Sequence, residues 1–547
     1  MPAALRPQRL PDRPLAGLAV LLGLKTTGPG GLGSFPAQNE MPGVSGITHD
    51  SRRVLPGDVY AALPGSRYHG GRFCAQAAAN GAVAVLTDPA GRDLAVGSGL
   101  PVLVVGDPRS RLGEAAAWIY GQPSTRLLLI GVTGTSGKTT TTYLLESGLR
   151  MAGHLTGLIG GVETRVGADI QPSLLTTPEA TDLQAFLAVM AEQEISAAAM
   201  EVSSHALALR RVAGTSFAVA IFTNLSQDHL DFHTSLDDYF AAKSQLFTPS
   251  YARAGVVNLD DQHGRLLAAA AQIPITTFSA AGRPAADWRA VDVRAGADGS
   301  AFRVIGPGGV EADASVAMPG PFNVANALGA IVALVEAGIG LAAAVAGVAA
   351  CPGVPGRLER VDAGQDFTVL VDYSHKPGAV EAVLTALRPV TQGSLTIVLG
   401  CGGDRDKAKR PLMGAAAASL ADAAFLTSDN PRSEDPLAIL SQMLAGTLGV
   451  PARDRAAVLL EPDRAAAIGL AIARAGKGDV VLIAGKGHEL GQYAGTAVIP
   501  FDDRQVAREA LARRRATEDA TMAAVHGTRQ PQASVAPEDT TADPEDE

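Results

Sequence analysis

The chain has 547 residues, of which 47% are hydrophobic and only 4% aromatic, and its formal net charge is −10. At about 100–200 residues per domain, this length suggests three domains. The negative charge argues against general nucleic-acid binding, and the absence of a G-X-Y period excludes a collagen-like structure. The three scattered cysteines are too few for a disulfide framework or a zinc site, so we expect a protein of the reducing cytoplasm.

The first apolar run, residues 15–24, is about half as long as a membrane span. Prolines precede it and no small-residue cleavage pattern follows it, so we interpret it as an amphipathic helix rather than a signal peptide. Strands are expected next at residues 83–87 and 102–105. A turn-forming cluster around Pro123 closes a first domain, residues 1–122.

A second domain, residues 123–355, is expected to open with an apolar strand at residues 127–132 and to end in the Pro- and Gly-rich segment 351–356. A third domain follows, residues 356–516. Short apolar runs alternate with Ala- and Leu-rich helical segments in all three domains, which favours α/β folds built on mostly parallel sheets. The other predicted strands of the two larger domains are residues 197–202, 219–223, 255–258, 368–371, 395–399, 424–427 and 480–483.

The last segment, residues 517–547, has no apolar periodicity, and we expect a disordered acidic tail. It holds eight acidic side chains and one basic one, so it carries −7 of the net charge of −10. The 516 residues before it are therefore nearly neutral.

The segment TGTSGKTT, residues 133–140, follows the predicted strand 127–132. Glycines at this place let backbone amides surround phosphate oxygens, and a following helix adds its positive N-terminal end. Lys138 is expected to reach the β- and γ-phosphates of a nucleotide, and the Thr139 hydroxyl to bind Mg²⁺. Val132 replaces the first glycine of the strict pattern, but the flanking strand and helix still favour nucleotide binding over a structural turn. The candidate ATP contacts are Gly134, Thr135, Ser136, Gly137, Lys138, Thr139 and Thr140.

Other strand ends of the second domain also carry polar residues. Glu201 ends an apolar run at the edge that carries the loop, which suits a Mg²⁺ ligand, although alone it is more typical of a solvated or capping residue. Residues 224–233 contain two Asp and two His, an unusual concentration at the mouth of a site.

All four predicted strands of the third domain run into polar segments that contain Gly or Pro. Arg405 and Arg432 supply guanidinium forks that match carboxylates, and Glu489 can receive an ammonium. An amino-acid-like, zwitterionic ligand explains these residues most simply; a scaffold with ordinary loops is the alternative.

Together these motifs resemble the Mur ligases of bacterial cell-wall synthesis, in family order from residue 47 to residue 510. The resemblance is closest to the members that add meso-2,6-diaminopimelate to UDP-N-acetylmuramoyl-L-alanyl-D-glutamate. It implies a small UDP-binding domain, a central P-loop domain and a C-terminal Rossmann-like domain that receives the amino acid. It also implies ATP and Mg²⁺, these two small-molecule substrates, no nucleic acid, a cytoplasmic location and a monomer.

The resemblance assigns further roles in the first two domains. Ser136 stands where the family's phosphate loop commonly has Asn, and we expect little effect because the loop acts through its backbone. Glu201 and His229 correspond to Mg²⁺ ligands, and Lys243 to a lysine that the family carbamylates. A carbamate is an anionic oxygen ligand, whereas Mg²⁺ would repel a bare ammonium; from spacing alone, Lys243 is typical of a helix surface. The residues matched to the UDP-linked substrate are Ser51, Thr176, Thr177, Ser203 and Arg211.

The third-domain assignments follow from the same resemblance. Asn323 and Asn326 resemble an N-x-x-N nucleotide contact, and on this resemblance we group them with that domain although they precede its boundary at residue 356. Arg357 and Asp372 correspond to residues that meet phosphates and ribose when the domain closes. His375 lies in DYSHKP, where the family usually has DYAHTP, so no role is carried over to the lysine of this motif.

The DNPR motif at residues 429–432 predicts the choice of amino acid. Diaminopimelate has a carboxylate on the far carbon that lysine lacks, so a bidentate Arg432 favours diaminopimelate, while lysine leaves the guanidinium unpaired. The expected diaminopimelate contacts are Arg405, Asp429, Asn430, Pro431, Arg432, Gly485 and Glu489.

The implied reaction is phosphorylation of the D-Glu γ-carboxylate by ATP, followed by attack of the diaminopimelate amine on the acyl phosphate. One alternative is a related ligase that adds lysine or D-Ala-D-Ala, or that extends folylpolyglutamate. Another is a P-loop protein that hydrolyses a nucleotide without forming an amide. The expected catalytic residues are Lys138, Glu201, His229, Lys243 and Arg357.

Overall fold

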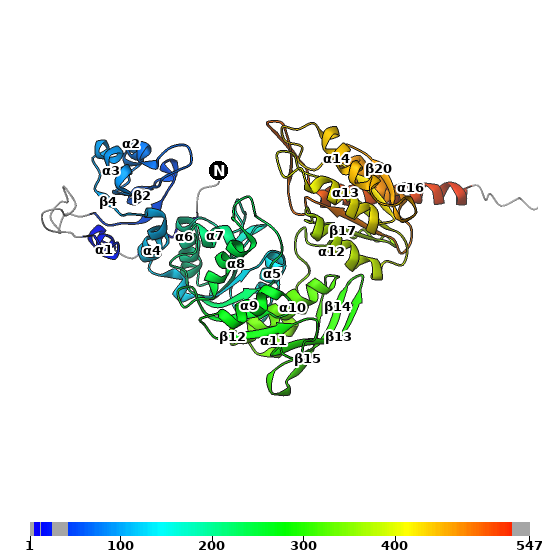
Figure 1. The fold of residues 1–547 in the computed structure, drawn as a ribbon, viewed down its shortest axis with the longest axis horizontal. Helices are drawn as coiled ribbons and strands as arrows, with labels where there is room; N and C mark the ends of the chain where they lie inside the picture. Colours follow the sequence, from blue (N-terminus) through cyan, green and yellow to red (C-terminus); the bar gives the residue numbers. More distant parts are fainter. Residues whose placement is uncertain (1–4, 11–12, 25–41, 528–547) are drawn as a thin grey trace, which may run out of the picture. The chain divides into compact units, whose positions relative to one another are not determined.

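The computed structural model describes residues 5–10, 13–24 and 42–527, with side chains to residue 520. Its contacts divide the chain into two compact units, Met1–Leu358 and Glu359–Glu547. The α/β class expected from the sequence is confirmed, because helices alternate with predominantly parallel sheets in both units (Figure 1).

The first sheet of the N-terminal unit has four parallel strands in chain order. The two expected strands are present, and two short ones precede them. Leu15, Leu18, Val59 and Leu103 are fully buried in its core, and the helix expected at residues 15–24 spans Leu15–Leu21. The elements are α1 (Leu15–Leu21), β1 (Gly46–Thr48), β2 (Asp58–Ala62), α2 (Cys74–Ala79), β3 (Ala84–Thr87), α3 (Pro89–Ala95), β4 (Val102–Val104) and α4 (Pro108–Ile119).

The second sheet of this unit has eleven strands. Its centre is parallel and contains the expected strands, with β5 between β9 and β10. Antiparallel hairpins extend both edges, which we did not predict. The strands are β5 (Leu128–Thr133), β6 (Thr156–Ile159), β7 (Glu163–Val166), β8 (Asp169–Pro172), β9 (Ala197–Glu201), β10 (Phe217–Phe222), β11 (Ala252–Asn258), β12 (Ile275–Ser279), β13 (Trp288–Gly296), β14 (Gly299–Ile305) and β15 (Glu311–Val316).

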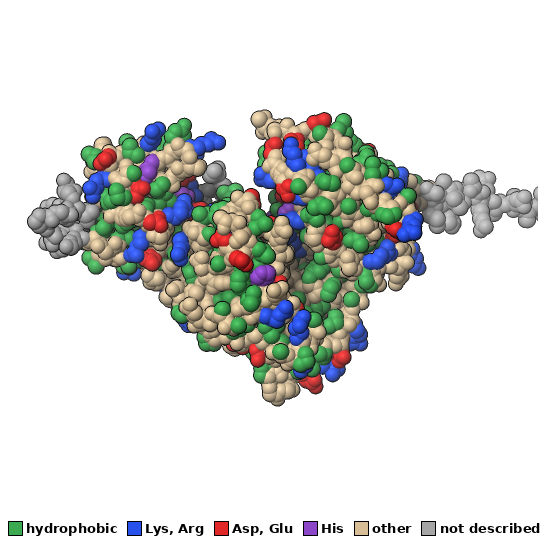
Figure 2. Space-filling model, viewed as in Figure 1, with side chains coloured by type: hydrophobic (Ala, Val, Ile, Leu, Met, Phe, Trp, Pro, Cys, Tyr) green, Lys and Arg blue, Asp and Glu red, His purple; other side chains and the backbone are tan. Residues whose placement is uncertain are grey.

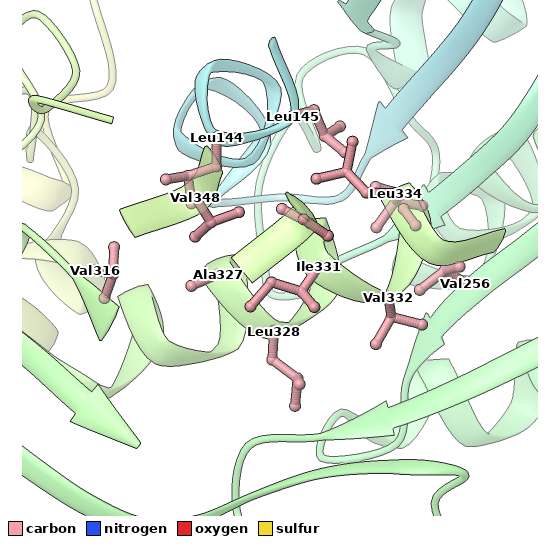
Figure 3. Packing of buried hydrophobic residues seen from close by; sticks show 14 of the residues in the cluster. Leu144, Leu145, Val256, Val316, Ala327, Leu328, Ile331, Val332, Leu334 and Val348 are labelled. Atoms are coloured by element: carbon pink, nitrogen blue, oxygen red, sulfur yellow. The ribbon is translucent and has the colours of Figure 1, made fainter. Parts of the chain in front are cut away.

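Helix α10 is the centre of the apolar core beside this sheet (Figure 3). Ile331 and Leu334 of α10 are fully buried, as are Leu144 and Leu145 of α5. A helix that is apolar on most of its surface must be covered on all sides, and α5, α11 and the sheet cover it. The helices are α5 (Lys138–Met151), α6 (Ala180–Glu192), α7 (Ser204–Ala208), α8 (Leu236–Ser244), α9 (Gln262–Ala270), α10 (Pro321–Glu336) and α11 (Leu341–Ala349).

The C-terminal unit contains a six-stranded sheet with the order β16-β17-β21-β18-β19-β20. All pairs except β16–β17 are parallel, so the four predicted strands end at one edge. A separate hairpin, β22 (Gly491–Ala494) and β23 (Ala497–Pro500), follows β21. The other elements are β16 (Glu359–Arg360), β17 (Thr368–Asp372), α12 (Pro377–Leu387), β18 (Leu395–Leu399), α13 (Lys409–Leu420), β19 (Ala423–Leu426), α14 (Pro436–Leu448), β20 (Ala457–Leu460), α15 (Arg464–Arg474), β21 (Val480–Ala484) and α16 (Asp503–Gly527).

The expectation of disorder from Thr517 onward is wrong for its first part, because α16 continues to Gly527. This stretch is rich in Ala with Glu and Met, which are good helix formers, and Arg514 Nε lies 2.8 Å from Glu518 Oε1 one turn later. The rest of the expected tail, residues 528–547, lies outside the described residues.

The surface fits a nearly neutral body. Figure 2 shows Lys, Arg, Asp and Glu side chains interspersed over the visible face. No helix among the described residues is long and apolar enough to cross a membrane.

Candidate functional site

The loop between β5 and α5 has the backbone geometry of a phosphate loop. Gly134 has φ 151° and Gly137 has φ 86°, conformations that favour glycine. A Cβ on Gly137 would lie 2.3 Å from Asn326 Oδ1, so this glycine is also required by space. Asn224, in the segment that follows the neighbouring strand β10, holds the loop: its Oδ1 accepts from the Ser136 amide at 3.0 Å.

Lys138 is the first residue of α5. The amides of a helix's first turn have no acceptors within the helix. They can therefore donate to an anion bound at the helix N-terminus. The Lys138 ammonium folds over the loop and donates to the carbonyls of Gly134 at 2.9 Å and Thr135 at 3.0 Å. The structure therefore combines a helix N-terminus and a cation in one loop, the arrangement that binds an anionic phosphate.

Glu201 lies beside this loop, as the sequence predicted. In the parallel register, Glu201 of β9 pairs with Val132, the second-to-last residue of β5, and the phosphate loop follows directly after β5. Its side chain is 2% exposed, and Oε1 accepts from the Gly161 amide at 2.8 Å. One oxygen of the Glu201 carboxylate is thus fixed by a backbone amide. It lies at the same edge of the sheet as the phosphate loop, where a cation bound to phosphates would lie.

Lys243 is not on a helix surface, so the interpretation from its spacing alone is wrong. Its side chain is 1% exposed, and Nζ donates to the Gly134 carbonyl at 2.8 Å. Nζ also lies 4.5 Å from the centroid of the Tyr239 ring, and burial raises the pKa of that tyrosine. The fold brings Lys243 to the same loop carbonyl as Lys138 because α8 packs behind the phosphate loop.

His229 lies in the loop after β10, with a left-handed backbone (φ 54°). Its Nε2 is 3.2 Å from Asp228 Oδ2, and its ring meets that of His205 edge-on at 4.8 Å. Burial lowers the pKa of His205. Among the described residues, no group of three or more His, Cys, Asp and Glu side chains could hold a metal. Mg²⁺ commonly keeps waters and phosphate oxygens with only one or two protein carboxylates, so Glu201 and a hydroxyl fit it without such a group.

Asn323 and Asn326 belong to the N-terminal unit, which corrects their grouping with the third domain. Both lie on α10, which packs against α5. Asn326 Nδ2 donates to Asn323 Oδ1 at 3.2 Å, and Asn326 Oδ1 lies in reach of the Thr141 hydroxyl at 3.5 Å. Arg357 reaches the same place: its guanidinium donates to Thr139 Oγ1 at 3.2 Å. The placement arises from helix packing, which the motif's position in the sequence does not reveal.

The residues matched to the UDP-linked substrate form a second group in this unit. Thr177 Oγ1 donates to the Glu201 carbonyl at 2.8 Å and accepts from the Ser203 amide at 3.0 Å. Arg211 Nη1 lies 3.4 Å from the Thr177 carbonyl. Three of the five residues are therefore in contact, and Thr176 is their chain neighbour.

Ser51 lies in a cleft of about 480 Å³ in the first domain. Its hydroxyl donates to Gln76 at 2.8 Å. Arg109 lines the same cleft and lies 3.3 Å from Glu179, which Arg211 approaches to 2.9 Å from the other side. The Arg109–Glu179–Arg211 chain of charges thus connects the cleft to the Thr177 group.

In the C-terminal unit, the predicted amino-acid contacts surround the ends of β19 and β21. Asn430 Nδ2 donates to Glu489 Oε2 at 2.8 Å. Gly485 has φ 114°, and a Cβ there would lie 2.7 Å from Asp429 Oδ2. Arg432 has φ 52°, and its guanidinium donates to the Gly403 carbonyl at 2.8 Å. The Gly403 amide donates to the Asn430 carbonyl at 2.9 Å, so the arginine fork and the carboxylate are linked through Gly403 and Asn430.

Arg405 is an exposed residue of the loop after β18. The buried side chain of Arg410 holds that loop in place. Arg410 is fully buried and donates to both Glu434 oxygens, at 3.0 and 2.9 Å, and to the Gly402 carbonyl at 3.1 Å. This guanidinium lowers the pKa of Glu434 to about 2. The pair ties the Arg405 loop to the segment that follows Arg432.

Asp372 and His375 lie at the end of β17. Asp372 is 7% exposed, and its Oδ1 accepts from the Ser374 amide at 2.8 Å. Burial lowers the pKa of His375 to about 4, and its Nδ1 lies 2.7 Å from the Tyr373 carbonyl. His375 is consequently neutral at physiological pH.

Three family models match the chain in succession. They are described as the Mur ligase family catalytic domain (residues 43–120), the Mur ligase middle domain (residues 132–334) and the Mur ligase glutamate ligase domain (residues 356–487). A UDP-N-acetylmuramoyl-L-alanyl-D-glutamate–2,6-diaminopimelate ligase of Streptomyces coelicolor is 59% identical over 510 residues, covering 93% of this chain and 98% of the relative. The chain belongs to the Mur ligase family.

Further relatives of this Mur ligase have the same or a related name. The ligase of the same name from Corynebacterium glutamicum is 46% identical, covering 86% of this chain and 92% of its own. A UDP-N-acetylmuramyl-tripeptide synthetase of Leifsonia xyli is 45% identical, covering 93% and 98%. Among solved structures, a 2,6-diaminopimelate ligase matches with TM-score 0.63 at 34% identity, over 86% of this chain and 96% of that one. MurF of Acinetobacter baumannii, at 21% identity and TM-score 0.61, shows the shared fold.

Sequence reasoning missed several residues behind the amino-acid group of this ligase. Lys486 is fully buried and donates to Asn430 and Glu489. Arg464 and Asp503 form a fully buried pair with two contacts of 2.7 Å. Lys486 lies in the segment KGHE, residues 486–489, between the predicted contacts Gly485 and Glu489, so its place in the sequence was a signal for its role. Arg464 gave none, because its partner is 39 residues away.

Breaking the Arg464–Asp503 pair should destabilise the C-terminal unit strongly. Arg464 also donates to the Ala484 carbonyl at 2.9 Å, so it supports the end of β21. We expect Arg464→Met to cost about 3–5 kcal/mol of unfolding free energy, because a buried carboxylate is left without its partner. The double variant Arg464→Met/Asp503→Leu should recover most of that loss.

Calorimetry of the full chain measures this as a shift of the thermal unfolding midpoint. The matched control is Arg453→Met, which breaks an exposed pair with Asp454 at 3.2 Å and should cost less than about 1 kcal/mol. A midpoint for Arg464→Met equal to that of Arg453→Met would contradict the prediction.

Proposed function

We propose that this Mur ligase joins meso-2,6-diaminopimelate to the D-Glu γ-carboxylate of UDP-N-acetylmuramoyl-L-alanyl-D-glutamate, with hydrolysis of ATP to ADP and phosphate. The observation that carries the amino-acid choice is the set of Arg432, Asn430 and Glu489, which hydrogen bonds link through Gly403. It offers a cationic fork and a carboxylate to a ligand end that bears both a carboxylate and an ammonium. We expect the enzyme to be a cytoplasmic monomer that acts in peptidoglycan precursor synthesis.

The phosphate loop is proposed to hold ATP. Its first-turn amides and Lys138 face the phosphates, and Asn323, Asn326 and Asp372 serve as further contacts to the nucleotide. Arg357 already donates to Thr139 Oγ1, so its guanidinium is in reach of phosphate oxygens at that hydroxyl. Lys138 and Arg357 stabilise negative charge that spreads over the oxygens of the transferring phosphoryl group.

Mg²⁺ is proposed to bind near Thr139, Glu201 and His229, where it supplies charge neutralisation for the phosphates. Lys243 fits this site as a carbamate. Its nitrogen would keep one N–H for the Gly134 carbonyl, now at 2.8 Å, while the new oxygens bring negative charge to a buried position. A carbamate replaces an ammonium that would repel the metal.

Thr176, Thr177, Ser203 and Arg211 are proposed to hold the peptide end of the UDP-linked substrate, and Ser51 its uridine end. Arg211 lies between the Thr177 carbonyl and Glu179, so its guanidinium is fixed for a carboxylate. The γ-carboxylate takes the phosphoryl group and ADP leaves. The diaminopimelate amine then attacks the acyl carbon, loses a proton and expels phosphate.

Omission of single components tests this proposal. The purified full chain is incubated with ATP, Mg²⁺, UDP-N-acetylmuramoyl-L-alanyl-D-glutamate and meso-diaminopimelate, and ADP and the new amide are quantified. We expect both products in equal amounts, and neither when the dipeptide substrate or the amino acid is left out. Steady ADP release without an amino acid would instead support a nucleotide hydrolase and defeat the proposal.

A further inference from the structure

Lys486 is a fully buried lysine at the end of β21, and it is absent from the predicted site. Its three ammonium protons have three acceptors: Asn430 Oδ1 at 3.0 Å, Glu489 Oε2 at 3.0 Å and the Gly491 carbonyl at 2.7 Å. An ammonium has three donors and no acceptor, so this side chain is completely satisfied and cannot turn toward a ligand.

These contacts fix the orientation of the Asn430 amide. Its Oδ1 accepts from Lys486 and from the Tyr493 amide at 3.1 Å, while its Nδ2 donates to Glu489. A flipped amide would turn its NH₂ toward two donors. Lys486 and the β22–β23 hairpin together therefore determine which side of Asn430 faces Glu489.

The same contacts divide the two oxygens of Glu489. Oε2 accepts from both Lys486 and Asn430, and no side chain or amide among the described residues donates to Oε1. The Glu489 side chain is 31% exposed. Oε1 is therefore the oxygen left to accept an ammonium from solution.

Arg432 is held by the same hairpin. Its amide donates to the Tyr493 carbonyl at 2.8 Å, and the Gly495 amide donates to the Arg432 carbonyl. This explains how a non-glycine residue is kept at φ 52°. Lys486 donates to Gly491, the first residue of the hairpin. One buried cation thus connects the segment that carries the arginine fork with the one that carries the carboxylate.

We propose that Lys486 is a positioning residue for the amino-acid substrate: it holds Glu489 and Asn430 so that Glu489 Oε1 faces the substrate ammonium. This rests on the proposed function. A buried ion pair is weak grounds for a role in stability, because a packed apolar side chain often serves as well. Positioning of the carboxylate gives the cation a role that an apolar side chain could not fill.

The test is a double-mutant cycle on the full chain, with Lys486→Met, Glu489→Gln and the double variant. We expect Lys486→Met to raise the KM for diaminopimelate by about 10–100-fold, the value of one or two hydrogen bonds to a charged group. The KM values for ATP and the UDP-linked dipeptide should change less than about twofold. Because Lys486 acts through Glu489, the double variant should have the same KM for diaminopimelate as Glu489→Gln alone.

Arg514→Met is the control for general destabilisation. Arg514 lies in the same unit, donates to the carbonyls of Ile472 and Ala475, and has no contact with the amino-acid group. It should lower the melting temperature without changing any KM. Additive effects of Lys486→Met and Glu489→Gln, or equal changes in all three KM values, would overturn the inference.

The remaining outcomes are separable. If Lys486→Met alone does not fold, Lys486→Gln replaces it. Glutamine is one atom shorter, is uncharged and has two donors, so it cannot serve Asn430, Glu489 and Gly491 together, and an unchanged KM for diaminopimelate would overturn the inference. If the unmodified chain does not saturate with diaminopimelate, the proposed function fails. If it saturates and Lys486→Met has the same KM, only the positioning role fails.

Discussion

Lys138→Met should abolish ATP-dependent amide formation. The ammonium of Lys138 lies within 3.0 Å of two loop carbonyls, and methionine keeps its length but not its charge. Removing one preorganised donor from a developing anion lowers kcat by about 10²–10³-fold. We therefore expect kcat, measured by ADP release with all substrates present, to fall by at least this factor.

Arg150→Met is the matched control, since Arg150 lies on the same helix far from the loop and is half-exposed at 55%. It should retain the activity of the unmodified chain. A Lys138→Met variant with more than about a tenth of the original kcat would contradict a phosphate role for this lysine, because that loss is smaller than one such donor supplies.

Arg432→Ala should impair diaminopimelate use and leave ATP binding intact. The Arg432 fork is half-buried and anchored through Gly403, so its loss would remove the charge-assisted, bidentate contact that we propose it makes to the far carboxylate. We expect kcat/KM for diaminopimelate to fall by about 10–100-fold, in line with hydrogen bonds to charged groups. The KM for ATP should stay within about twofold.

Arg432→Lys separates charge from geometry. A lysine keeps the cation but cannot form the fork, so it should recover only part of the diaminopimelate activity. Arg453→Ala, on an exposed arginine in the same unit, should have no effect. Equal losses in the use of ATP and of diaminopimelate by Arg432→Ala would count against the specificity role.

The strands that carry the candidate site were predictable from the sequence. Each is a short, apolar, fully or largely buried run, and such runs are recognisable without their neighbours. The polar residues after them meet at one edge because parallel strands share a direction. The placement of Glu201 beside the phosphate loop follows from this rule alone, and the β5–β9 register agrees with it.

The edge hairpins of the large sheet were missed although they have local signals. Ala297 and Asp298 form the two-residue turn between β13 and β14, and Gly299, the first residue of β14, pairs with Gly296. Asp and Gly at such a short connection are typical of a hairpin. Because strands β13 and β14 are partly exposed, polar residues interrupt their apolar sequence. They therefore do not form the continuous apolar runs by which the other strands were recognised.

Residues whose position depends on distant packing could not be found by pattern. Lys243 has the spacing of a surface residue, yet α8 buries it against the phosphate loop. Asn326 reaches the loop only because α10 packs beside α5. Family resemblance named these residues, and tertiary structure explains why they contact the loop.

Competition between amino acids tests the central proposal most directly. The full chain is given ATP, Mg²⁺ and UDP-N-acetylmuramoyl-L-alanyl-D-glutamate with equal concentrations of meso-diaminopimelate and L-lysine, and the amide products are separated by mass. The fork at Arg432 predicts that the diaminopimelate product predominates by at least about 100-fold, since lysine leaves a charged donor unpaired. A larger amount of the lysine product, or equal amounts of the two products, would contradict the proposed specificity.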